Sequence, residues 1–74
     1  MATSGKKTNN IIKQYGLTVG DKLFTVFVYL ESRSDCRASI GQKGIHIRLS
    51  KYMSEHDRFD QEMELLDWAK KYIA

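Results

Sequence analysis

Residues 37–49 read Arg37-Ala-Ser-Ile-Gly-Gln-Lys-Gly-Ile-His-Ile-Arg-Leu49, and this segment sets the architecture of the 74-residue chain. From Ile45 to Leu49, apolar side chains alternate with polar ones, which is typical of a strand with one buried face. The arm before the turn alternates in the same way. Gly41 and Gly44 bracket the turn and can adopt the positive φ angles that a tight hairpin requires. The segment therefore predicts a β-hairpin.

Two further strands are predicted before this hairpin. Residues 11–19 alternate loosely between apolar and polar side chains, and Gly16 argues against a helix there. Residues 23–31 are dense in β-branched and aromatic side chains, which favour strands. A turn at Gly20-Asp21-Lys22 separates the two segments. The face of residues 23–31 that should meet the core is formed by Phe24, Val26, Val28 and Leu30.

A helix is predicted after the hairpin. Ser54 fits the N-cap position, and Asp57 follows three residues later as in a capping box. Acidic residues fill the first turns, and Lys70 and Lys71 come near the end, as the helix dipole favours. The face that should close over the sheet carries Phe59, Met63, Leu66, Ala69 and Ile73. A second apolar group consists of Leu65, Trp68 and Tyr72. These side chains either wrap the edge of the sheet or contact a protein partner or a second copy of the chain.

These elements predict an α+β fold, a three- to four-stranded antiparallel meander with one C-terminal helix packed on one face. A chain of 74 residues is long enough for one domain, which we assign to residues 11–74. Residues 1–10 are polar and lack periodicity, so we expect them to form a disordered tail. One face of the sheet would then have no helix over it.

The charge is unevenly distributed along the chain. The net charge is +3, yet residues 1–52 carry nine Lys and Arg against three Asp and Glu, whereas residues 53–74 carry three against six. A basic sheet layer beside an acidic helix makes the molecule dipolar. The sheet layer could simply be solvated, or it could bind an anion such as nucleic acid.

Cysteine content and hydropathy point to a cytoplasmic protein. Cys36 is the only cysteine, so no internal disulfide can form. A lone thiol in a chain without a secretory signal is typical of a reducing compartment. No apolar segment approaches the roughly 20 residues that a transmembrane helix needs, so no membrane partner is expected. Cys36 alternates with apolar neighbours and should be buried and inert.

The residue types that carry catalysis are not arranged for it. His46 and His56 form no helical pair, no H-E-x-x-H occurs, and one cysteine cannot build a thiolate zinc site. The carboxylates of the predicted helix are spaced as a solvated face. We therefore expect neither an enzyme nor a metal or other cofactor.

The predicted open sheet face offers a different chemistry. Cations interleaved with aromatic rings can hold phosphates and stack bases. The side chains that alternation places on this face, together with the lysine at the hairpin tip, are Phe27, Tyr29, Arg37, Lys43, His46 and Arg48. They predict an RNA- or DNA-binding surface. The alternative is that this face packs against another protein or a second copy of the chain.

The amino-acid sequence around the turn also matches a nucleic-acid-binding motif. Ile40 to Ile47 fit I-G-x-x-G-x-x-I, the pattern of the G-x-x-G loop of KH-type RNA-binding domains. That loop lies between two helices. Here both flanks alternate with period two, so the hairpin explains the glycines better.

The order of these segments resembles one family. The segment Val28–Glu31, the hairpin of residues 37–49 and the acidic helix with Leu65-x-x-Trp68-Ala-Lys-Lys are similar to the N-terminal β-rich segment of YgjP-like metal-dependent peptidases, a zincin family. The similarity spans roughly residues 20–74. That family's activity resides in a downstream H-E-x-x-H helix, which this sequence lacks, and Ser50-Lys51 replaces its usual proline. The resemblance therefore implies a non-catalytic module that positions a substrate or partner.

Overall fold

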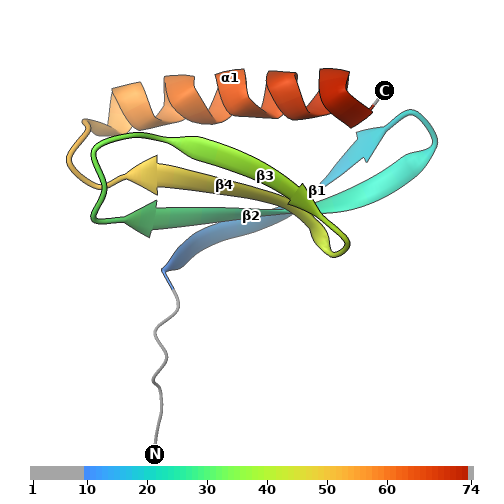
Figure 1. Ribbon diagram of the computed structural model, residues 1–74, viewed down its shortest axis with the longest axis horizontal. Helices are drawn as coiled ribbons and strands as arrows, with labels where there is room; N and C mark the ends of the chain where they lie inside the picture. The colour runs from blue at the N-terminus through green and yellow to red at the C-terminus, as the bar shows by residue number, and fades with distance from the viewer. Residues whose placement is uncertain (1–9, 74) are drawn as a thin grey trace, which may run out of the picture.

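The computed structural model describes residues 10–73 as four strands and one helix (Figure 1). The α+β class, with a four-stranded sheet and a C-terminal helix on one face, is confirmed. Residues 1–9 of the predicted tail lie outside the described residues. The elements are β1 (Ile11–Val19), β2 (Lys22–Glu31), β3 (Arg37–Gly41), β4 (Gly44–Ser50) and α1 (Glu55–Ile73).

The sheet is mixed, which corrects the expected antiparallel meander. The strand order is β1-β2-β4-β3; β1 pairs antiparallel with β2, β3 pairs antiparallel with β4, and β2 pairs parallel with β4. The connection of residues 32–36 crosses the end of β4, where Lys51 N donates to Glu31 O at 2.9 Å. Central strands buried on a face are the most apolar strands of a sheet. Placing β4 beside β2 unites the two strands that carry the core.

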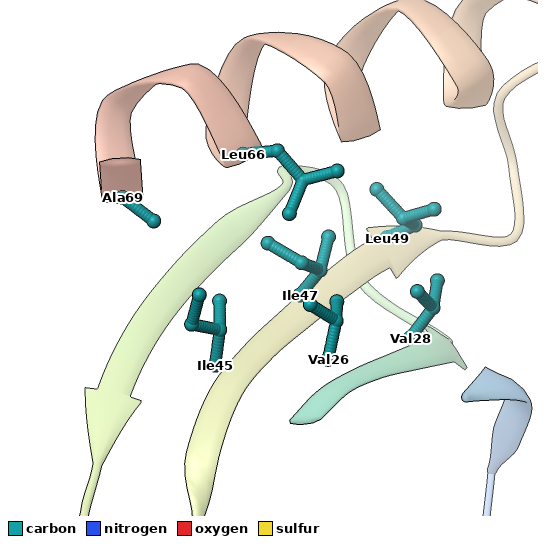
Figure 2. Packing of buried hydrophobic residues seen from close by; sticks show 7 residues of the cluster. All are labelled: Val26, Val28, Ile45, Ile47, Leu49, Leu66 and Ala69. Carbon is teal, nitrogen blue, oxygen red and sulfur yellow. The ribbon is translucent and has the colours of Figure 1, made fainter. Parts of the chain in front are cut away.

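The core lies between α1 and the centre of the sheet (Figure 2). In Figure 2 the two helix side chains, Leu66 and Ala69, point from α1 toward the strands. The small side chain of Ala69 is fully buried, which lets the helix approach the sheet closely. The strand side chains of the core are Val26, Val28, Ile45, Ile47 and Leu49. Burying such side chains stabilises the fold by about 1.5–3 kcal/mol each.

The N-terminal end of α1 is capped as predicted. The backbone N–H of Asp57 donates to Ser54 Oγ at 3.2 Å, and Arg58 N donates to Ser54 O at 2.9 Å. The first bond satisfies an N–H group that has no partner within the helix, and the second is the first i→i−4 bond of α1.

The face that α1 turns toward the sheet differs from the predicted one. Phe59 and Met63 are 55% and 40% exposed, so the expectation that they close the core is wrong. Glu62 is buried instead, at 3% exposure, on the same side as Leu66 and Ala69. The apolar pattern of the sequence could not predict a carboxylate at the centre of the packed face, because its partners come from a distant strand.

Those partners are two side chains of β1. Lys13 Nζ lies 2.9 Å from Glu62 Oε1, and the Tyr15 hydroxyl donates to Glu62 Oε2 at 2.8 Å. Burial, followed by the hydrogen bond and charge of Glu62, raises the pKa of Tyr15 well above its ordinary value. A buried carboxylate is tolerated when hydrogen bonds and an opposite charge replace its water. This network ties the edge strand β1 to the helix.

We expect Glu62→Ala to lower the free energy of unfolding by about 2 kcal/mol, because it leaves the Tyr15 hydroxyl and Lys13 without their acceptor. Glu64→Ala, at an exposed position of the same helix, is the matched control and should change it by less than about 0.5 kcal/mol. Urea unfolding followed by circular dichroism measures both variants. Equal stability of the two variants would contradict a role for the network.

Gly44 is required where β4 begins. Its φ is 146°, and a Cβ at this position would lie 2.1 Å from the carbonyl oxygen of Thr25 on β2. Strands also lie on both sides of Gln42 and Lys43, which excludes the KH-type G-x-x-G loop, because that loop lies between two helices.

We expect Gly44→Ala to cost about 3 kcal/mol or more of unfolding free energy, through backbone strain and collision with Thr25. Gly41→Ala is the control, because a Cβ there meets only His46 Nε2, at 4.0 Å. It should change stability by no more than about 1 kcal/mol. Thermal or urea unfolding distinguishes them, and a tolerated Gly44→Ala would show that the parallel pair is not so tightly constrained.

Candidate functional site

The sheet face opposite α1 carries two cross-strand rows of polar and aromatic side chains. In the register of the sheet, Phe27 of β2, His46 of β4 and Ser39 of β3 are neighbours. Tyr29, Arg48 and Arg37 form the next row along the same three strands. We call these six residues the open face. Because successive side chains of a strand point to opposite faces, these six residues lie on the face away from the core side chains.

The centre of the open face is a stack of rings. The Phe27 and His46 rings lie 5.0 Å apart, centroid to centroid, at an interplanar angle of 12°. The Tyr29 hydroxyl and His46 Nδ1 are 2.9 Å apart and share a hydrogen bond. The guanidinium of Arg48 lies over the Tyr29 ring, 4.3 Å from its centroid. Such cation–π and stacking contacts fix the side chains in one arrangement.

His46 is neutral in this arrangement at neutral pH. Burial, and then the positive charge of Arg48, lower its pKa below the ordinary value of 6.5. A neutral imidazole can accept the Tyr29 proton at Nδ1 and keep a donor on its other nitrogen. The positive charge of the open face therefore comes from arginine.

Both arginines of the open face are ion-paired. Arg48 Nη1 lies 2.5 Å from Glu31 Oε2, and Arg37 Nε lies 3.3 Å from Asp35 Oδ2. Arg37 and Arg48 are direct cross-strand neighbours, a placement that like charges disfavour. The two carboxylates offset that repulsion. Sequence alternation identified the cations but not these partners, since Asp35 lies in a loop.

Lys43 lies apart from the ring stack. It is exposed in the turn between β3 and β4, at the opposite end of the hairpin from Arg48. Five of the six residues predicted to bind nucleic acid, Lys43 being the exception, thus occupy the two adjoining rows.

The residues predicted to contact a partner divide into two groups. Leu65 is partly buried and packs against the core. Trp68 and Tyr72 are exposed, and their rings stack with centroids 5.5 Å apart. Of the three residues predicted to contact a partner, the exposed ones are therefore this aromatic pair, without Leu65.

A groove between α1 and β1 was not predicted. It has a volume of about 630 Å³, and its apolar lining comes from Ile12, Leu49 and Phe59, with Glu62 among the polar residues. The register shifts between Ile11 and Lys13, and Ile12 is largely exposed there. No pattern in the sequence marks a bulge at Ile12, so this groove could not be anticipated.

Two other features bear on chemistry. His56, Asp57 and Asp60 are exposed at the start of α1, with ligand-capable atoms within 4.8 Å of one another. Exposed groups of this kind are common on helix surfaces, so we assign no metal site to them.

Cys36 is half-buried rather than fully buried as expected, and its Sγ lies 3.4 Å from Met53 Sδ.

Comparison with protein-family models, curated proteins and solved structures found no match to this chain. The resemblance to YgjP-like peptidases therefore stays a prediction. Within residues 10–73, α1 does not combine the length and apolar character that crossing a bilayer demands.

We expect Arg48→Gln to raise the pKa of His46, because a nearby positive charge no longer opposes protonation of the ring. The pKa should stay below 6.5, because burial is the larger cause of the shift. Titration of the imidazole resonances by NMR measures it. Lys70→Gln removes the same charge from α1 and should leave the His46 pKa unchanged. An unchanged or lower His46 pKa in Arg48→Gln would contradict this account.

Proposed function

We propose that this chain is a small non-catalytic binding protein that holds single-stranded nucleic acid on its open face. The observation that carries the proposal is the platform formed by Tyr29, His46 and Arg48, three side chains fixed by contact with one another on a sheet face that lies opposite α1. Bases stack on such rings whatever their sequence, and the phosphates between them pair with nearby cations.

The distribution of charge supports this choice of ligand. Six of the nine acidic residues lie on α1, which covers the other side of the sheet. A polyanion approaching the open face therefore meets arginine before it meets the helix carboxylates.

The ion pairs of the open face set the expected strength. Glu31 and Asp35 neutralise part of the arginine charge, and His46 contributes none at neutral pH. Binding should therefore be weak, depend strongly on salt, and draw much of its affinity from stacking.

Titration of fluorescently labelled single-stranded RNA and DNA at two salt concentrations tests the proposal. We expect saturable binding that weakens as salt rises. Tyr29→Ala should reduce affinity by about 1–3 kcal/mol through lost stacking, whereas Tyr29→Phe, which keeps the ring, should lose less.

An aromatic variant on the other side of the sheet serves as the control. Trp68→Ala, which removes an exposed ring from α1, is matched to Tyr29→Ala and should leave affinity unchanged. No binding at low salt, or equal effects of Tyr29→Ala and Trp68→Ala, would overturn the proposal.

A protein partner is the second candidate function, favoured by the stacked, exposed pair Trp68 and Tyr72. Exposed aromatic pairs of this kind are enriched at protein interfaces. Such a role would suit the accessory module that the resemblance to YgjP-like peptidases implies. Measuring the mass of the chain in solution separates the two: a dimer that Trp68→Ala converts to a monomer favours the protein partner, and a monomeric wild-type chain favours nucleic acid.

A further inference from the structure

Five charged side chains alternate in sign along the end of the open face. Arg48 Nη1 contacts Glu31 Oε2 at 2.5 Å, and Arg33 Nη1 contacts Glu31 Oε1 at 3.1 Å. Arg33 Nε then contacts Asp35 Oδ1 at 3.2 Å, and Arg37 Nε contacts Asp35 Oδ2 at 3.3 Å. Three guanidiniums are thus held side by side by two carboxylates. We call these five residues the arginine ladder.

The backbone beneath the ladder is fixed to the end of β4. Arg33 N donates to Glu31 O at 2.9 Å, and Lys51 N donates to the same oxygen at 2.9 Å. The Ser50 hydroxyl donates to the carbonyl oxygen of Arg33. The crossing loop, residues 32–36 between β2 and β3, therefore holds Arg33 and Asp35 in a defined position beside the open face.

The ladder keeps positive charge and free donor capacity. Hydrogen bonds from Arg33 and then Arg37 lower the pKa of the Asp35 carboxyl, so Asp35 is ionised at neutral pH and the ladder carries three positive and two negative charges. Among the described residues, the ion pairs of Arg37 and Arg48 each use one nitrogen of a guanidinium that has several N–H donors. Those donors suit the oxygens of a phosphate.

We propose that Arg33, Arg37 and Arg48 form a phosphate-binding subsite for the backbone of the bound strand, with Glu31 and Asp35 as internal competitors. This inference rests on the proposed function and deepens it. In the free protein the carboxylates position the guanidiniums. When a phosphodiester binds, it takes over part of their hydrogen bonding. Because Arg48 also lies over the Tyr29 ring, the subsite adjoins the place where a base would stack.

Removing one competitor should therefore strengthen binding. Asp35→Asn keeps the shape of the side chain but removes its charge, and we expect single-stranded oligonucleotide to bind about two- to fivefold more tightly at low salt. Asp67→Asn is the matched control: Asp67 is similarly exposed and also forms an ion pair, with Lys71 at 3.1 Å, but it lies on α1. It should change affinity less than Asp35→Asn.

The ladder fails as a subsite if Asp35→Asn binds no more tightly than Asp67→Asn, even when the wild-type protein binds the oligonucleotide. That result would leave the stacking platform, and so the proposed function, standing. Amide spectra of both variants, matched to the wild type, establish that the fold is intact in the comparison.

A second measurement decides the case in which no oligonucleotide binds. Tripolyphosphate is titrated into the wild-type protein while the side-chain Nε–H resonances of Arg33 and Arg37 are followed by NMR. Saturable shifts that weaken in Arg37→Gln support a phosphate subsite that takes its ligand from another source, although the proposed function has failed. Absence of shifts overturns the subsite.

Discussion

The parallel pairing of β2 with β4 is the constraint on which the rest of the molecule depends. These strands supply the five strand side chains of the core, so they must be neighbours beneath α1. The chain reaches this arrangement by passing first to β3, which forces the loop of residues 32–36 across the end of β4. It also brings the start of β4 against the backbone of Thr25, where glycine alone fits without collision. The arginine ladder lies at this end of the sheet because the loop of residues 32–36 supplies Arg33 and Asp35 there.

The helix is held by a mixture of apolar and polar contacts. Leu66 and Ala69 pack on the strands, whereas Glu62 accepts hydrogen bonds from Lys13 and Tyr15 of β1. The acidic character of α1 thus has two parts: one carboxylate is satisfied inside the structure, and the others face solvent. This arrangement keeps most negative charge on one side of the sheet and leaves Arg37 and Arg48 on the other.

Much of the candidate site could be read from alternation. Period-two spacing placed Phe27 and Tyr29 on one strand and His46 and Arg48 on another, and the register then made them neighbours. The sequence did not predict the partners of the arginines, because Glu31 meets Arg48 only through the parallel pairing of β2 with β4, and Asp35 contacts Arg37 from the loop of residues 32–36. The sequence did not predict the groove beside Ile12 either, since it depends on a bulge in β1 and on the packing of α1 against β4 and β3.

Local patterns in the chain were sufficient to specify each strand, the hairpin at Gly41 and Gly44, and the helix start at Ser54, because these depend on neighbours a few residues away. The strand order and the face that α1 buries were settled by long-range packing. Phe59 and Met63 have the right spacing for a core, yet Glu62 takes the central position because two side chains some 50 residues earlier neutralise and bond it. A hydrophobic pattern predicts which apolar side chains are buried. It cannot predict a buried charge, because that charge is stable only when partners distant in the sequence contact it in the folded chain.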